Sequence, residues 1–124
     1  MELETTRWHH WGLGANATYV REDNANVDND PLYGATLKAD YDQTGVLKAA
    51  LTGNYVWWNT ATRGFDPHYN SIVWDASLTK TISLSRASVD LFLVGHNLFS
   101  SSNYWDVDYQ NPGRWLEAGV RYHF

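Results

Sequence analysis

The residues of this chain whose chemistry could hold a metal ion are its five histidines. His9 and His10 are adjacent, so in a strand their side chains would point to opposite faces and could not chelate one ion together. His68 falls in a predicted loop, whereas His96 and His123 are expected on the polar faces of strands. The sequence contains no cysteine, which excludes thiolate ligands. No pair of histidines has convincing ligand spacing, so we expect no metal site and no bound cofactor.

Nucleophilic catalysis would require a serine, a histidine and an acid held within hydrogen-bond reach of one another. Ser100, Ser101 and Ser102 lie in a predicted loop, and nothing in their spacing brings them to His96 and an acid. We therefore expect no catalytic residue and no enzymatic activity.

An acidic segment at 21–31 could supply oxygen ligands for calcium. It lacks both the central glycine and the terminal glutamate of an EF-hand loop. A solvated acidic loop is the favoured interpretation, and calcium binding is the alternative.

Aromatic residues are unusually frequent: seven Trp, eight Tyr and four Phe make up 15% of the chain. Such rings suit either a ligand-binding surface or the two interfacial belts of a membrane barrel. Candidate ligand-binding residues are those expected at or beyond strand ends on one side, where they could stack on an aromatic or flat metal-chelate ligand. They are Trp58, Phe65, Tyr104, Trp105 and Tyr109. The alternative is that these rings are belt residues or the cores of loops.

The elements that must position these residues are strands, because apolar and polar residues alternate along most of the chain. Six strands are expected, near 7–20, 32–42, 46–58, 70–83, 87–98 and 114–124. No window has a convincing helical period, and no run of about 18 apolar residues could form a transmembrane helix. The pattern therefore predicts an all-β, antiparallel fold for residues 1–124.

Aromatic residues bracket the apolar faces of these predicted strands. Trp11 and Tyr19 are eight residues apart, and so are Tyr33 and Tyr41, with small or aliphatic residues between them. A tilted transmembrane strand of about 9–11 residues crosses the hydrocarbon, so this spacing places a ring at each interface. The pattern favours a strand face that meets lipid over one packed inside a soluble sheet.

The predicted connections alternate in length. Those near 42–45 and 84–86 are brief, whereas those near 21–32, 59–70 and 99–113 are long. Short turns at one end and long loops at the other are typical of up-and-down outer-membrane barrels, with the short turns and the C-terminus periplasmic. The opposite strand faces carry charges of mixed sign, which we interpret as a cross-strand network on a watery lumenal wall. These charged residues are Lys38, Asp40, Lys48, Asp75, Asp90, Glu117 and Arg121.

Six strands are too few for the smallest usual barrel, which has about eight. An open sheet in lipid would leave unpaired backbone groups along two edges, at several kcal/mol each. The segment Met1-Glu2-Leu3-Glu4 has neither the basic stretch nor the apolar core of a signal peptide. We therefore expect residues 1–124 to be the C-terminal part of a barrel whose other strands lie upstream or on a companion chain.

The end of the chain resembles two known patterns. Glu117, Gly119, Tyr122 and Phe124 occupy the four positions of the C-terminal signal that the assembly machinery of bacterial outer-membrane barrels reads. The segment 89–99, which ends in Asn-Leu-Phe, resembles the penultimate strand of TonB-dependent outer-membrane receptors. Tyr104 and the Pro-Gly-Arg segment at 112–114 match that family as well. The likeness is sharp over 89–124 and generic elsewhere.

The resemblance implies a location in the bacterial outer membrane and a role in taking up a scarce nutrient such as a siderophore–iron complex, heme or cobalamin. The implied partners are membrane lipid, the remaining strands of a roughly 22-stranded barrel, a plug domain, the inner-membrane protein TonB acting through that plug, and the assembly machinery. No plug domain is recognisable in this sequence, so the family implies a role for the complete assembly. A net charge of −5 argues against a nucleic-acid partner.

Two alternatives remain open at this point. A small barrel that self-associates could act as a pore or adhesin, with identical chains closing a ring. A soluble lipocalin-like binder would instead use the apolar face to line a ligand cavity.

Overall fold

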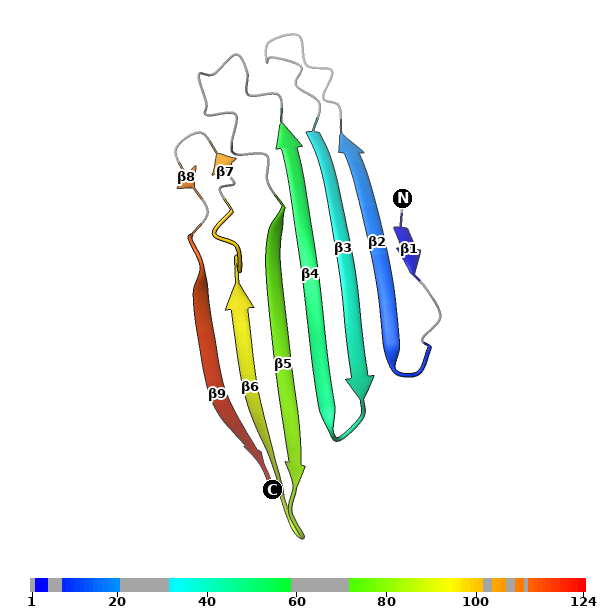
Figure 1. Cartoon of the computed structure of the whole chain (residues 1–124), viewed down its shortest axis with the longest axis vertical. Coiled ribbons are helices and arrows are strands. Elements are labelled where there is room, and N and C mark those ends of the chain that lie inside the picture. Colours follow the sequence, from blue (N-terminus) through cyan, green and yellow to red (C-terminus); the bar gives the residue numbers. More distant parts are fainter. Residues whose placement is uncertain are drawn as a thin grey trace.

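The computed structural model describes residues 2–4, 8–20, 32–58, 72–101, 104–106, 109–110 and 112–124. Within these residues the chain is all β, with no helix, and its long strands form one antiparallel sheet (Figure 1). The strands are β1 (Glu2–Glu4), β2 (Trp11–Val20), β3 (Leu32–Gln43), β4 (Leu47–Trp58), β5 (Val73–Ser83), β6 (Ser88–His96), β7 (Tyr104–Asp106), β8 (Tyr109–Gln110) and β9 (Trp115–His123).

The sheet follows the chain, with each strand beside the next one in the order β1-β2-β3-β4-β5-β6-β9. All six predicted strands are present and pair antiparallel, so the predicted up-and-down order is confirmed. The sheet is not closed into a barrel: β1 and β9 are its two edges. In Figure 1 the short turns and the C-terminus lie at the lower end, and β2 and β4 end at the upper end, which is the long-loop end of the sheet.

The start of the chain differs from its prediction, which placed a strand over 7–20. Instead, His9 and His10 form a two-residue turn with φ values of 46° and 76°. Trp8 and Trp11 close this turn through two reciprocal backbone hydrogen bonds of 2.9 Å. Positive φ at both central residues is the geometry of a type I′ hairpin turn, which matches the twist of the flanking strands. The segment before this turn forms β1, which pairs antiparallel with β2. β1 is a seventh strand of the sheet that was not predicted, and the two histidines do not lie in a strand.

Two further differences concern the last long connection. We expected a strand to 98, but β6 ends at His96, because Asn97 adopts a left-handed conformation with φ 46°. The connection itself contains β7 and β8, which pair as a two-stranded ribbon where only a loop was expected.

The predicted division of residues between the two faces is confirmed by the strand registers. Residues directly opposite each other in an antiparallel pair lie on the same face. One such row crosses all six long strands and is entirely apolar or aromatic: Trp11, Tyr41, Ala49, Leu78, Leu93 and Ala118. β1 keeps the same parity, since Leu3 lies opposite Ala15. One face of the sheet is therefore predominantly apolar from β1 to β9.

The described residues form no second layer over this apolar face. Leu13 is 56% exposed and Val120 is 67% exposed, and no large described side chain is fully buried. The polar face is more enclosed: the side chains of Asp40 and Asp90 are only 20% and 18% exposed. This is the reverse of a soluble sheet, where the apolar face is packed against another layer.

Two glycines in the strands lie beneath aromatic rings of the neighbouring strand. Trp74 is directly opposite Gly53, and a Cβ at Gly53 would approach its ring to 2.8 Å. Phe92 is directly opposite Gly119, where a Cβ would approach the ring to 2.4 Å. The missing side chains let the rings lie flat on the backbone, which joins β4 to β5 and β6 to β9.

Replacing Gly119 by valine should therefore expel the Phe92 ring and lower the free energy of unfolding by about 1–3 kcal/mol, the usual cost of overpacking. The measurement is a urea titration in detergent followed by tryptophan fluorescence. Gly14→Val is the matched control on the same face, because a Cβ there meets nothing closer than 3.9 Å. Equal stability of the two variants would show that the ring does not need the glycine.

Candidate functional site

Asn97 organises the base of the last long connection. Its side chain is buried, at 4% exposure, and its backbone has φ 46°, a conformation that asparagine tolerates better than most residues. Its Nδ2 donates to the carbonyl oxygens of Ser101 at 2.9 Å and Pro112 at 3.0 Å. Its Oδ1 accepts from the backbone N–H of Ser101 at 2.8 Å. One amide thus joins the start of the connection to the residues just before β9.

The same turn is tied to β5. The backbone N–H of Asn97 donates to Oδ1 of Asp75 at 2.9 Å, and that of Leu98 donates to the carbonyl of Trp74 at 2.8 Å. Phe99, by contrast, is 72% exposed. The Asn-Leu-Phe segment therefore has a physical role here, which is to fix where the chain leaves the sheet. The sequence motif drew attention to Asn97, but its partners come from three separate segments and could not be read from spacing.

His96 lies on the polar face at the same end of the sheet. Its Nδ1 is 3.8 Å from Asp75 Oδ1, and its Nε2 is 3.9 Å from Glu117 Oε1. The imidazole stacks on the Trp115 indole with ring centroids 3.9 Å apart and an interplanar angle of 12°. β5, β6 and β9 therefore meet around one histidine. The carboxylates are partly exposed and both distances exceed hydrogen-bond length, so we expect each contact to contribute little to stability.

His123 lies on the same face at the short-turn end. Its Nε2 is 3.0 Å from Asp90 Oδ2, and Thr81 Oγ1 donates to the other oxygen of that carboxylate at 2.7 Å. Arg121 is directly opposite Asp90 in the register. Both histidines on this face thus engage carboxylates. Among the described residues no three histidine, aspartate or glutamate side chains are grouped so that they could hold a metal ion.

Two lysines of the polar face also lie close to carboxylates. Lys38 Nζ is 3.7 Å from Asp40 Oδ1 along β3. Lys48 Nζ is 3.7 Å from Asp42 Oδ2, and these two residues are direct cross-strand partners. The predicted grouping of mixed charges on one face is therefore present, with Asp42 as a member that we did not single out.

The apolar face carries an aromatic pair at each end of β2 and β3. The rings of Trp11 and Tyr41 lie 5.2 Å apart at the short-turn end, and those of Tyr19 and Tyr33 lie 5.1 Å apart at the long-loop end. Each pair consists of direct cross-strand partners. The eight-residue spacing seen in the sequence thus becomes two aromatic pairs on β2 and β3, one at each end, which we refer to as the aromatic belts.

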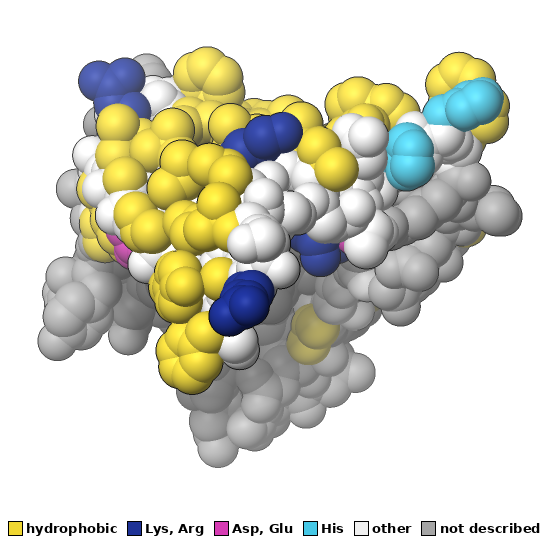
Figure 2. Space-filling view, turned by 90° about the horizontal axis from the view of Figure 1, so that it is seen from below, with side chains coloured by type: hydrophobic (Ala, Val, Ile, Leu, Met, Phe, Trp, Pro, Cys, Tyr) yellow, Lys and Arg dark blue, Asp and Glu magenta, His cyan; other side chains and the backbone are white. Residues whose placement is uncertain are grey.

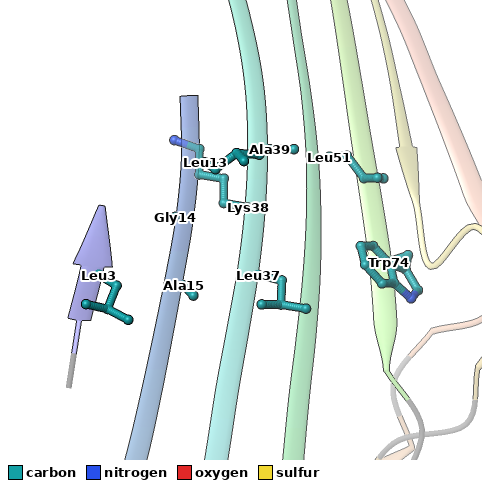
Figure 3. Close-up of a pocket in the computed structure, with 9 residues that line it drawn as sticks. All are labelled: Leu3, Leu13, Gly14, Ala15, Leu37, Lys38, Ala39, Leu51 and Trp74. Atoms are coloured by element: carbon teal, nitrogen blue, oxygen red, sulfur yellow. The ribbon is translucent and has the colours of Figure 1, made fainter. Parts of the chain in front are cut away.

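Between the belts the apolar face is hollowed. The hollow has a volume of about 480 Å³. Leu37, Leu51 and Trp74 project around it, whereas Ala15 and Ala39 leave it shallow (Figure 3). Its lining is almost wholly apolar, because most of its residues lie on the apolar face; Gly14 and Lys38, which belong to the opposite face, also line it.

The predicted ligand-binding aromatics are only partly placed. Trp58 ends β4, Tyr104 and Trp105 lie in β7, and Tyr109 lies in β8. Figure 1 shows all three strands reaching the long-loop end of the molecule. Their side chains lie outside what the structure describes, as do Phe65, His68 and the acidic segment 21–31. Ligand binding and calcium binding by these residues stay predictions.

Three residues of the predicted assembly signal lie in β9, on both of its faces, and the fourth, Phe124, follows the strand directly. Glu117 and Gly119 lie on the polar face, opposite Val94 and Phe92. Tyr122 is opposite Val89 on the apolar face, and its ring lies 5.9 Å from that of Phe124, which is fully exposed.

The position of Lys80 on the apolar face was not predicted. It lies on the apolar face, with Leu47 and Leu91 as its direct cross-strand neighbours. Extending the alternation of Trp74, Ala76 and Leu78 by one step would have identified it.

Comparisons with known proteins add no relative: no protein-family model, no curated protein and no solved structure matches the chain. No helix among the described residues has the length and apolar character needed to cross a membrane.

Substituting Asn97 by aspartate should loosen the last connection, because the two Nδ2 donors are lost and a carboxylate then faces two carbonyl oxygens. We expect faster hydrogen exchange at the Ser101 amide and a loss of about 1–3 kcal/mol, the cost of leaving buried polar groups unsatisfied. Asn16→Asp, at an exposed position in β2, serves as the control. Unchanged exchange at Ser101 would contradict the role assigned to the Asn97 amide.

Proposed function

We propose that this chain is a membrane-embedded wall segment of a bacterial outer-membrane β-barrel. The observation that carries this proposal is the apolar face that crosses all six long strands, with Lys80 as its charged exception, and has no covering layer among the described residues. Exposed aliphatic side chains over such an area are unfavourable in water, at about 25 cal/mol per Å². Acyl chains would cover this face without a second protein layer, while the enclosed polar face would meet a watery lumen.

The aromatic belts support this location. Eight residues of strand separate the two rings on β2, a length of about 27 Å at the usual rise. With a strand tilt of about 40°, the belts are about 20 Å apart along the membrane normal. This is close to the apolar band of about 25 Å in outer-membrane barrels, whose interfaces are lined by aromatic girdles.

The stagger of the strands supports a barrel rather than a flat sheet. The row that starts at Trp11, the first residue of β2, ends at Ala118, five residues before β9 ends at His123. In Figure 1 the short turns accordingly lie progressively lower from β2 to β6. Barrel strands tilt relative to the barrel axis, and closure requires a stagger of this kind.

Within outer-membrane barrels, we propose a TonB-dependent receptor that takes up a scarce nutrient such as a siderophore–iron complex, heme or cobalamin. This rests on the resemblance over 89–124, and the contacts of Asn97 give its central motif a structural reason. This chain would supply barrel wall, extracellular loops and the C-terminal assembly signal. The remaining strands and the plug that engages TonB would come from other sequence.

The location in lipid is tested by charge substitution on adjacent residues of β4. Leu51→Arg places a cation on the apolar face near the centre of the band, and we expect it to disfavour insertion by about 2–4 kcal/mol. Thr52→Arg places the same charge on the polar face and should have little effect. Flotation with phospholipid vesicles measures the bound fraction of each variant. Equal partitioning of both variants would refute the assignment of faces.

The receptor assignment is tested by purifying the chain from membranes in detergent and identifying every polypeptide that stays with it by mass spectrometry. We expect a polypeptide that supplies a plug and further barrel strands. A ring of identical chains would instead favour a self-associating pore or adhesin, and a monodisperse monomer in detergent-free buffer would favour a soluble binder. Either result would overturn the receptor assignment.

A further inference from the structure

Lys80 is the exception on the apolar face. Among the described strand residues that face this side, it is the sole charged side chain, and no acidic group of the described residues forms a salt bridge with it. Leu47 and Leu91 flank it across the strands, and Leu78 and Ile82 flank it along β5. Leu78, Leu91 and Ile82 are each more than 40% exposed, so Lys80 lies within an open aliphatic surface.

Lys80 lies near the short-turn end of the sheet. It lies three residues before β5 ends at Ser83, about 10 Å along the strand from the short-turn end. A lysine stem covers apolar surface while its ammonium reaches the interface. Arg86 lies in the turn that follows β5. Figure 2, which views this end from below, shows Lys and Arg side chains beside a broad hydrophobic cluster, with little acidic surface in view.

The apolar hollow lies mainly over β1, β2 and β3, and it reaches the strands around Lys80 through Leu51 of β4 and Trp74 of β5. Along β4, Leu47 neighbours Lys80 and Leu51 lines the hollow, four residues and about 14 Å away. Along β5, Trp74 of the hollow is six residues from Lys80. One leaflet of hydrocarbon is about 15 Å thick, half of the usual core. A cation at the interface and an apolar hollow near the membrane midplane are thus separated by about the length of one lipid tail.

We infer that Lys80 and the hollow form a binding site for one anionic phospholipid of the leaflet at the short-turn end. The ammonium binds the headgroup phosphate, and one acyl chain lies along β4 and β5 with its end in the hollow beside Leu51 and Trp74. The charge complementarity of a lone cation on an apolar wall selects an anionic lipid over a zwitterionic one. This inference rests on the proposed membrane location.

The test uses vesicles of equal parts phosphatidylglycerol and phosphatidylcholine. The chain is reconstituted and extracted gently, and native mass spectrometry counts the lipids retained. We expect about a fivefold preference for phosphatidylglycerol, which corresponds to about 1 kcal/mol for one basic residue near an anionic surface. Lys80→Gln should abolish the preference, and Lys80→Arg should keep it. Lys48→Gln removes the same charge from the polar face and should leave the preference unchanged.

A second variant tests the hollow. Ala39→Phe fills it without altering charge, so it should reduce the total lipid retained. Equal lipid retention by Lys80→Gln and the unmodified chain, or no preference in the unmodified chain, would overturn the site. Lys80→Gln removes a charge from the apolar face and should not hinder insertion. If this variant binds vesicles normally but loses the preference for phosphatidylglycerol, the result supports the lipid site separately from the membrane location. Failure of the unmodified chain to bind vesicles would overturn both this site and the proposed membrane location.

Discussion

The structure depends on one geometric constraint, the twofold period of extended strands combined with antiparallel pairing. Side chains alternate between faces along each strand, and direct partners share a face across strands. Because every long strand keeps most of its apolar residues on one parity, the registers unite them into one surface. A slip of one residue between any two strands would break this surface in half. Both the stability and the function of the chain therefore depend on what covers the apolar face.

The polar face carries the specific contacts of the molecule. Carboxylates there meet lysine, histidine or threonine partners, and the aromatic ring of Phe92 covers a glycine where the polar pattern is interrupted. Asn97 then fixes the exit from β6 through contacts with β5, with its own connection and with the residues before β9. The polar face is therefore held together by specific side-chain contacts, whereas the apolar face consists mostly of exposed hydrophobic side chains. Lys80 departs from this division, because it is a charged residue on the apolar face.

Alternation is a local property, so the sequence predicted the six long strands, their faces and the two aromatic belts. It did not predict β1, because His9-His10 lacks the glycine, asparagine or aspartate that usually marks a type I′ turn. It did not predict the partners of Asn97 either. Asp75, Ser101 and Pro112 come together only after β5, β6 and β9 have paired. The predicted ligand-binding rings depend still more on the long connections, where no periodic pattern constrains side-chain positions.

Strand direction separates two ways of completing this sheet. Directions alternate from β1 to β9, so the two edge strands of this seven-stranded sheet run the same way. If copies of the chain joined edge to edge, β9 of one copy would lie parallel to β1 of the next. Outer-membrane barrels built from one chain are antiparallel throughout, with an even number of strands. With β1 in place, an antiparallel ring needs at least one strand of opposite direction between β9 and β1. That requirement favours completion by strands of different sequence over self-association of identical chains.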